Sequence, residues 1–230
     1  MFTAANTIQN NHLAALKEQA EPRILNAIET ASHRTGVDFS YLMQQASAES
    51  SFNAEAEAKT SSASGLYQFI ESTWMQMVRR YGDQYGLGEY AEKIDGKGRV
   101  EDKTLRQEIL NLRKDPQVAA FLAAEFANEN AQYLQRNLDE NYGEVGSTEL
   151  YFAHFMGAGG ATAFLNAYKD NPVQTASDLF PEAARANRNV FYDPKTGEPR
   201  TLAGVYEFFD KKFGGTGDAP TGEKTQVAAR

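Results

Sequence analysis

Apolar side chains recur three or four residues apart along most of this chain, and glycine or proline interrupts the pattern at intervals. One such run comprises Ile24, Leu25, Ile28 and Ala31, and it ends at Gly36. This spacing places the apolar residues on one face of an α-helix. We find no internal repeat and no series of alternating strand patterns. The sequence therefore predicts an all-α fold.

Capping residues and breakers set the expected bounds of the other helices. Asp38 is a typical N-cap, and Pro116 suits a first helical turn, where its missing N–H is not needed. A glycine cluster at residues 157–160 divides one apolar helix in two, and the turn at Asp95 belongs to a loop-rich stretch over residues 86–103. Helices are predicted over residues 39–51, 72–81, 116–134, 148–156, 161–168 and 201–213, with a short one starting at Pro181.

The chain has 230 residues, of which 41% are hydrophobic, so it can form one sizeable core with a small appended lobe. We expect an N-terminal extension over residues 1–20 and one domain over 21–213, with its core at about 24–168. Residues 214–230 contain few apolar side chains and are predicted to be disordered. No apolar run approaches the roughly 20 residues of a transmembrane helix, and no signal peptide is recognisable. We expect a monomer.

Charge and residue types exclude several classes of function. A formal net charge of −8 with scattered basic residues argues against a nucleic-acid partner, which requires a basic face. The chain has no cysteine, and His12, His33 and His154 are far apart, so we expect no metal site. The glycines at 157–160 follow a helix and lack the lysine of a phosphate loop. No cofactor is predicted.

Glu49 stands out because helical spacing places it on the same face as Leu42, Ala46 and Phe52, towards the interior. A carboxylate in such a place is either paired within the core or used in chemistry. The chemical alternative is a general acid. Glu49 lies near the C-terminal end of its helix, where the helix dipole and a partly apolar pocket both favour the protonated carboxyl group. That state can protonate a glycosidic oxygen.

The residues around Glu49 form a recognisable pattern. Glu49-Ser50-Ser51-Phe52-Asn53 is followed by a polar spacer, then by Ser64-Gly65-Leu66-Tyr67-Gln68-Phe69, and then by Ser72-Thr73-Trp74. This order and spacing resembles the catalytic segment of soluble lytic transglycosylases, the lysozyme-like peptidoglycan enzymes of glycoside hydrolase family 23. Tyr67 stands where that family most often has methionine. The resemblance implies an all-α, lysozyme-like core with added C-terminal helices.

The resemblance also implies roles for the matched positions. Glu49 would protonate the leaving oxygen after N-acetylmuramic acid and then act as a base. Gln68 and the backbone at Ser64 and Gly65 would hold the N-acetyl or hydroxyl groups of the sugar, although Gln68 can instead stabilise the turn. Tyr67 is the aromatic residue that we expect to stack on a sugar, whereas Trp74 is expected to anchor the core.

The family's third element, Ala-Tyr-Asn before a glycine turn, has its best counterpart at Ala153-His154-Phe155-Met156-Gly157. His154 replaces the tyrosine of the family and Phe155 replaces the asparagine. His154 can assist Glu49 by hydrogen bonding, or it can be a core residue of its helix. Tyr151, on the same predicted helix, is a second candidate partner for Glu49.

The expected product depends on whether a second carboxylate takes part. A hydrolytic glycosidase needs one, whereas the resemblance implies that the substrate's own C6 hydroxyl attacks and leaves a 1,6-anhydro end. Glu55, Glu57 and Glu71 lie near the motif, although Glu55 and Glu57 fit a solvated loop better. We therefore expect a lytic transglycosylase, with a hydrolytic muramidase as the first alternative and a non-catalytic binding or scaffold module as the second.

Such an activity implies peptidoglycan as the partner and the periplasm or cell wall as the site of action. Because no export signal is recognisable, the expected contexts are a phage-type lysin, a component of a secretion or flagellar machine, or a truncated form. The segments Leu150-Tyr151-Phe152-Ala153-His154-Phe155 and Ala186-Asn187-Arg188-Asn189-Val190-Phe191-Tyr192 are similar to a transglycosylase subgroup of alphaproteobacteria.

Overall fold

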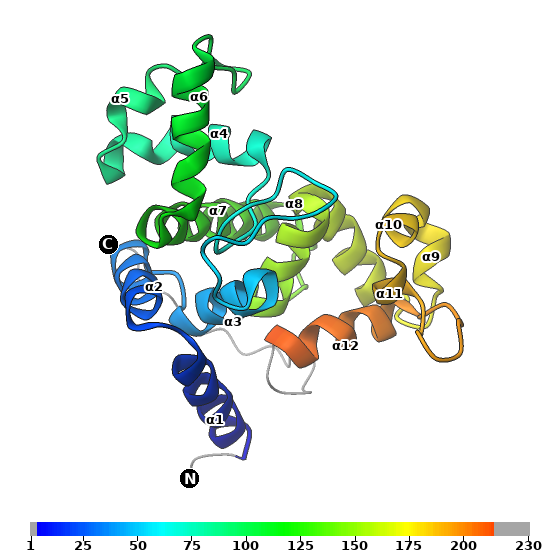
Figure 1. Cartoon of the computed structure of the whole chain (residues 1–230). Coiled ribbons are helices and arrows are strands. Elements are labelled where there is room, and N and C mark those ends of the chain that lie inside the picture. The colour runs from blue at the N-terminus through cyan, green and yellow to red at the C-terminus, as the bar shows by residue number, and fades with distance from the viewer. Residues whose placement is uncertain (1–3, 214–230) are drawn as a thin grey trace. The chain divides into compact units, whose positions relative to one another are not determined.

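The protein is all-α in the part of the chain that its structure, a computed structural model, describes: residues 4–213, with side chains from residue 11 onwards (Figure 1). Within those residues the non-helical pairing is limited to isolated β-bridges such as Glu57 with Ser64 and Ser64 with Phe69. The predicted fold class is confirmed. The tail predicted for residues 214–230 lies outside the described residues.

Contacts divide the chain into two compact units, which are described separately below. We call residues 10–129 the Glu49 unit, and residues 1–9 with 130–230 the Glu149 unit. Helices α1 (Ala4–Gln19) and α7 (Pro116–Asn137) each cross the division. The predicted single domain over residues 21–213 stays a prediction.

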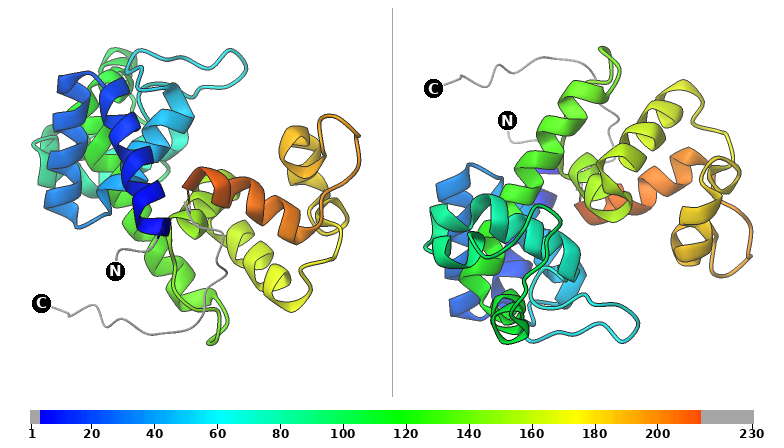
Figure 2. Two further views of the ribbon diagram at one scale, coloured as in Figure 1. Left: turned by 90° about the horizontal axis from the view of Figure 1, so that it is seen from below. Right: turned by 90° about the horizontal axis from the view of Figure 1, so that it is seen from above.

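The Glu49 unit is helical, with a long loop between α3 and α4 (Figures 1 and 2). Its core contains the fully buried side chains of Ile28, Leu42, Trp74 and Leu122. The Trp74 ring N–H donates to the Ile109 carbonyl at 2.7 Å, so Trp74 anchors the core as predicted. The unit contains α2 (Pro22–Thr35), α3 (Phe39–Ser50), α4 (Glu71–Tyr81), η1 (Gly82–Tyr85), α5 (Gly88–Ala91), α6 (Lys103–Asn111), η2 (Leu112–Lys114) and the first part of α7.

Local sequence signals placed several of these helix ends correctly. Asp38 caps α3 by accepting a hydrogen bond from the Tyr41 N–H at 2.9 Å, and Gly36 ends α2 in the left-handed conformation with φ 76°. The predicted turn at Asp95 is present, since the Gly98 N–H donates to the Asp95 carbonyl at 2.9 Å. The sequence reading missed α6, whose N-cap is Asp102.

The Glu149 unit packs α8 (Ser147–Asp170) against α12 (Leu202–Phe213). Aromatic rings fill the interface: Phe152 stacks on Phe164 at 4.6 Å between centroids and meets Phe209 edge-on at 4.8 Å. The helix α8 merges the two segments predicted around the glycine cluster. Gly157 alone leaves the helical conformation there, with φ 75°, so the cluster makes a kink rather than a turn. Three short helices complete the unit: α9 (Ala176–Leu179), α10 (Pro181–Ala186) and α11 (Arg188–Phe191).

A buried carboxylate organises the start of α8. The Glu149 side chain is 4% exposed and accepts hydrogen bonds from the Tyr206 hydroxyl at 2.7 Å and the Tyr142 hydroxyl at 3.2 Å. Its second oxygen accepts from the Gly146 N–H at 2.9 Å and so caps the helix. Burial, and then the charge of Glu149, raises the pKa of both tyrosines, which therefore remain hydrogen-bond donors.

No helix within residues 4–213 combines the length and apolar content that a membrane span requires.

The Glu149 network predicts a specific weakness of its unit. We expect Glu149→Ala to lower the unfolding free energy of this unit by about 2–4 kcal/mol, because it leaves two buried hydroxyls and a helix N-terminus without their acceptor. Hydrogen exchange of the α8 and α12 amides, followed by mass spectrometry, measures the change. Exposed Glu140→Ala is the matched control and should leave exchange unchanged. Equal protection in both variants would contradict the assigned role.

Candidate active site

The first part of the site is the C-terminal end of α3, which carries Glu49 in its last turn. Leu42 and Ala46 are fully buried, whereas Glu49 is half-buried at the edge of that face. The predicted direction of the side chain is therefore right only in part, because its carboxylate is not enclosed in the core. This position suits an acid that must contact both an apolar surface and a substrate.

The chain leaves α3 through two consecutive left-handed residues, Ser51 with φ 51° and Phe52 with φ 63°. The Ser51 N–H donates to the Ser47 carbonyl at 2.9 Å, and the Phe52 N–H donates to the Ala46 carbonyl at 3.3 Å. These are the bonds of a Schellman-type helix end, here made without the usual glycine. Phe52 is thereby turned inward and is 7% exposed. The cap fixes the direction in which the chain leaves Glu49.

Ser50 ties the end of α3 to the second motif. Its hydroxyl lies 2.8 Å from the Leu66 carbonyl and 3.1 Å from the carbonyl of Ala46, one turn earlier in the helix. The residue next to Glu49 is thus bonded to the turn that contains Gly65 and Gln68. Sequence reasoning included Ser50 in the motif but assigned it no role, because only the fold brings residues 50 and 66 together.

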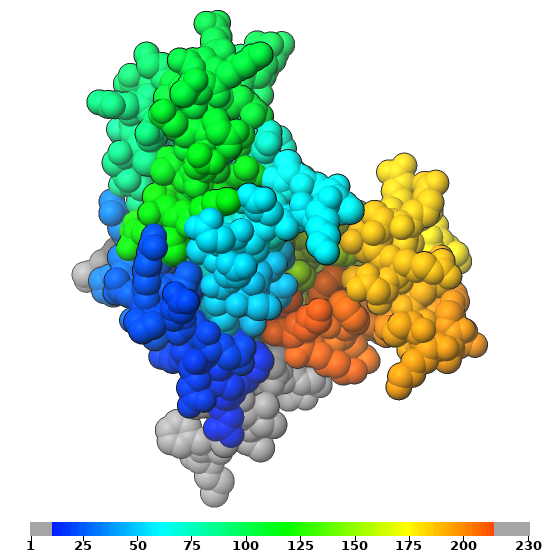
Figure 3. Space-filling model, in the orientation of Figure 1, coloured from blue at the N-terminus to red at the C-terminus, as the bar shows by residue number. Residues whose placement is uncertain are grey.

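The second part of the site is the turn over residues 64–69, at the base of the long loop between α3 and α4 (Figure 2). The outer residues of this loop, 59–62, are exposed and contribute to the surface in Figure 3. At the base, the Ser64 N–H donates to the Phe69 carbonyl at 3.2 Å, and the Gly65 N–H donates to the Ala56 carbonyl at 2.8 Å. Both N–H groups therefore serve the turn, and the expected contact of the Ser64 and Gly65 backbone with a sugar stays a prediction.

Gln68 has a left-handed backbone, φ 47°, and its side chain folds back onto the loop. Its amide Nε2 donates to the carbonyls of Gly65, at 2.9 Å, and Ala56, at 3.2 Å. These contacts show that the Gln68 side chain stabilises the turn, which was the alternative role expected for it. Both amide hydrogens are committed, and Oε1 has no acceptor bond among the described residues. The chemistry left to Gln68 is to accept a hydrogen bond from a ligand.

Gly65 is required for two reasons. Its φ is 82°, a conformation that side chains disfavour, and a Cβ at this position would lie 1.9 Å from the Arg113 carbonyl oxygen. The main chains of the turn and of η2 are therefore in direct contact at Gly65. The glycine of the motif is explained by this close approach within the fold.

Arg113, which sequence reasoning missed, holds the same turn through its side chain. The residue is 8% exposed, and its guanidinium donates to the carbonyls of Ser62 at 2.5 Å, Phe69 at 3.0 Å and Leu110 at 2.9 Å. Burial lowers the pKa of Arg113, while the nearby charge of Glu71 opposes that effect. The Phe69 carbonyl ends the turn and the Ser62 carbonyl lies two residues before its start, so Arg113 holds together the two chain segments that enter and leave it. No local pattern marks an arginine 45 residues from Gln68 as part of the site.

Tyr67 corrects the expected sugar-stacking role. It is 1% exposed, and its hydroxyl donates to the Leu42 carbonyl at 3.3 Å, so its ring belongs to the core. Burial raises the pKa of Tyr67 well above its usual value, with a smaller contribution from Tyr41. Burial, and then the charge of Glu49, raises the pKa of Tyr41 as well. The charge of Glu49 is therefore felt by the buried, protonated phenol of Tyr41.

The other carboxylates near the motif are committed to ion pairs. Lys114 Nζ lies 2.7 Å from Glu57 and 3.5 Å from Glu55, and Arg106 pairs with Glu71 at 2.5 Å. The side chains of Glu55 and Glu57 are 72% and 67% exposed, as expected for a solvated loop. All three glutamates considered as a second catalytic group thus have a cationic partner.

Tyr151 and His154 lie on α8 in the Glu149 unit, where Tyr151 stacks on Phe213 at 3.8 Å between ring centroids. The rings of Tyr151 and His154 are 5.7 Å apart, and both residues are half-buried. The structure places these two side chains together, as their spacing on one helix predicts. Their contribution to the site of Glu49 stays a prediction. Among the described residues, no group of three or more histidine, aspartate or glutamate side chains forms a metal site.

Comparison with protein families agrees with this geometry. Residues 26–92 match the family model described as "Transglycosylase SLT domain". The match extends from α2 to just after α5 and includes Glu49, Ser50, Gly65 and Gln68. The resemblance seen in the motifs is confirmed for this segment, which is similar to a lysozyme-like domain of peptidoglycan-lytic enzymes. Arg113 lies beyond the matched residues.

The approach of Gly65 to Arg113 can be tested against a matched glycine. Gly86 has a similar φ, 75°, but a Cβ there meets no atom within 4 Å. We expect Gly86→Ala to cost about 1–2 kcal/mol of unfolding free energy for its left-handed backbone, and Gly65→Ala to cost clearly more because the turn must move. Urea denaturation followed by the fluorescence of Trp74, the only tryptophan, reports on this unit. Equal losses would contradict the role of close approach.

Because the Arg113 side chain holds the turn, replacing it should lower the unfolding free energy. Lysine at this position should restore only part of that free energy. Arg113→Met leaves buried carbonyls without donors, whereas Arg113→Lys keeps the charge but replaces a planar fork with a single ammonium. We expect the unfolding free energy to fall in the order wild type, Lys, Met, by about 1–3 kcal/mol per step. Arg99→Met, at an exposed ion pair, is the control and should change little.

Proposed function

We propose that this protein is a peptidoglycan lytic transglycosylase that cleaves the β-1,4 bond between N-acetylmuramic acid and N-acetylglucosamine. The proposal rests above all on one observation. Glu49 is half-buried in the last turn of α3, and Ser50 beside it is hydrogen-bonded to the Leu66 carbonyl in the turn that carries Gln68. The similarity of residues 26–92 to the transglycosylase SLT domain supports it. The implied place of action is the periplasm or cell wall.

A single carboxyl group is sufficient for this reaction. Protonated Glu49 donates its proton to the glycosidic oxygen as the bond from that oxygen to C1 of the muramic acid breaks, and the N-acetylglucosamine leaves with a free 4-hydroxyl. The Glu49 carboxylate then accepts the proton of the C6 hydroxyl of the same muramic acid, whose oxygen bonds to C1. The product is a 1,6-anhydro sugar, Glu49 is protonated again, and no water is consumed.

The residues around Glu49 support the two proton transfers by holding the end of α3 in place and by contacting the sugar. Ser50 and the cap at Ser51 fix the end of α3, and with it the backbone that carries Glu49 next to the turn. Gln68 offers Oε1 to a hydroxyl or N-acetyl N–H of the sugar. The buried phenol of Tyr41, whose pKa the charge of Glu49 helps to raise, supplies an uncharged neighbour to that carboxyl group.

The test is mass analysis of the muropeptides released from purified peptidoglycan. We expect anhydro ends, which are lighter by one water than reducing ends, and a loss of release by roughly 100-fold or more in Glu49→Gln. Glu57→Gln removes a neighbouring carboxylate of the ion-paired set and should keep its activity. Reducing ends would instead identify a hydrolytic muramidase. Undiminished release by Glu49→Gln would overturn the assignment of the acid.

A further inference from the structure

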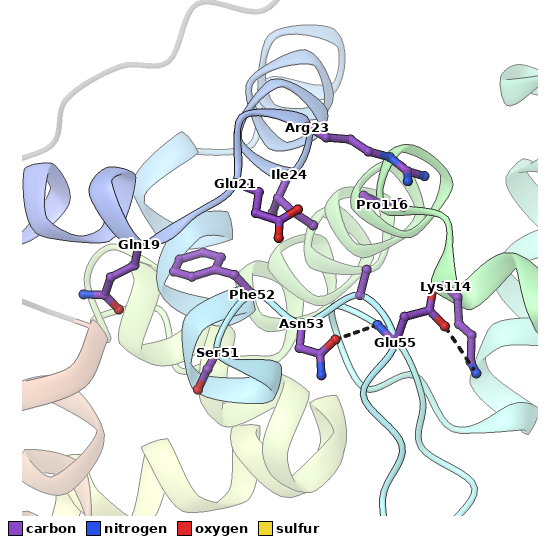
Figure 4. A pocket seen from close by; sticks show the side chains of 11 residues that line it. Gln19, Glu21, Arg23, Ile24, Ser51, Phe52, Asn53, Glu55, Lys114 and Pro116 are labelled. Carbon is purple, nitrogen blue, oxygen red and sulfur yellow. Dashed lines mark hydrogen bonds and ion pairs between the residues drawn. The ribbon is translucent and has the colours of Figure 1, made fainter.

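Two consecutive residues of η2 hold opposite arms of the long loop between α3 and α4. On the outgoing arm, Lys114 Nζ lies 3.5 Å from a carboxylate oxygen of Glu55, a pair that Figure 4 shows. On the returning arm, the Arg113 guanidinium donates to the carbonyls of Ser62 and Phe69. The loop is therefore attached to a segment that lies beyond the residues matching the family model.

The two attachments differ in strength because they differ in burial. The Glu55 side chain is 72% exposed, and an ion pair so open to water contributes little. Arg113 is buried, and one of its nitrogens, Nη1, donates to both carbonyls, at 2.5 Å to Ser62 and 3.0 Å to Phe69. Hydrogen bonds from a charged donor in a buried place are among the strong ones. Arg113 is therefore the attachment that determines where the returning arm lies.

The residue next to the Phe69 carbonyl is Gln68, whose side chain has one group left for a ligand. Its Nε2 donates to the carbonyls of Gly65 at 2.9 Å and Ala56 at 3.2 Å, which fixes the plane of the amide and the direction of Oε1. Gln68 itself is half-buried. A displacement of the Phe69 carbonyl moves the backbone of Gln68 and therefore turns this acceptor.

We propose that Arg113 is a positioning residue for glycan binding, which acts by holding the Phe69 carbonyl and thereby aims Gln68 Oε1 at the sugar. The inference rests on the proposed function. The guanidinium contacts no glycan, because it is buried and donates to three carbonyls of its own chain. A hydrogen bond that the substrate makes before and during the reaction lowers KM and leaves kcat unchanged. The end of α3, which carries Glu49, has its own cap.

The first experiment separates KM from kcat on soluble glycan strands from which an amidase has removed the peptides. Arg113→Gln should raise KM about tenfold, the loss of roughly one hydrogen bond, with kcat within about twofold of wild type. Arg113→Lys, which keeps the charge and can still reach a carbonyl, should restore part of the affinity. A lowered kcat with an unchanged KM in both variants would overturn the proposal.

Two control variants separate positioning from a general loss of stability or charge. Gly86→Ala strains the backbone of the same unit at a place where no atom lies near the added Cβ. Lys114→Met removes the neighbouring cation of η2 from its exposed ion pairs. Both should keep the wild-type KM. A KM raised as much in either control as in Arg113→Gln would overturn the role of Arg113.

A double-mutant cycle tests whether Arg113 acts through Gln68. Gln68→Met removes the acceptor and should raise KM about tenfold by itself. If the two residues act through one contact, Arg113→Gln added to Gln68→Met should raise KM little further, whereas independent effects would multiply to about 100-fold. Multiplying effects would overturn the proposed route.

Binding without turnover separates this inference from the proposed function. Calorimetric titration of the Glu49→Gln protein with the same strands should show a Kd that Arg113→Gln weakens about tenfold. The NMR signals of the Gln68 side-chain amide should shift in Arg113→Gln and stay in place in Gly86→Ala. An unchanged Kd or an unchanged Gln68 signal in Arg113→Gln overturns the inference even if wild type cleaves the strands. Strands that bind in this Arg113-dependent way and are not cleaved by wild type overturn the proposed function alone, and strands that do not bind overturn both.

Discussion

The contact of Gly65 with the Arg113 carbonyl is the constraint on which the site depends. It brings the main chain of the turn over residues 64–69 against η2, and the Arg113 side chain then bonds to the carbonyl of Phe69, at the end of that turn, and to that of Ser62, two residues before its start. A side chain at position 65 would occupy the space of the carbonyl oxygen. Once the turn is fixed, the Leu66 carbonyl is in place to receive Ser50, and the end of α3 is fixed in turn.

The same segment contains backbone that is energetically unfavourable. Ser51, Phe52 and Gln68 have φ values of 51°, 63° and 47°, and among the described residues they are the non-glycine positions with positive φ. Each left-handed residue costs roughly 1 kcal/mol, and such strain persists where surrounding bonds determine the conformation. Here the bonds are the helix-end pairs to Ser47 and Ala46 and the two donated by the Gln68 amide. Residues with a strained backbone thus lie just after Glu49, at Ser51 and Phe52, and within the turn, at Gln68.

Charge distribution separates Glu49 from its acidic neighbours. Glu55 and Glu57 share Lys114, and Glu71 pairs with Arg106, so each of these carboxylates has a cationic partner. Glu49 lies near the buried Tyr41, and its charge contributes to the raised pKa of that tyrosine.

The sequence by itself determined the helical class, most helix bounds and the identity of the motif, because these follow from apolar spacing, caps and breakers that act within a few residues. Asp38, Gly36 and Pro116 are examples, and so is the general position of Glu49 on α3. Only the tertiary structure decided that Tyr67 is a core residue, that Gln68 braces its own loop and that Arg113 holds the turn. The outcomes for Tyr67 and Arg113 depend on contacts between residues 25 to 51 positions apart in the chain, Tyr67 with Leu42 and Arg113 with Ser62, which no local pattern encodes. The Gln68 side chain bonds to Ala56, 12 positions earlier, across a loop whose path only the fold fixes.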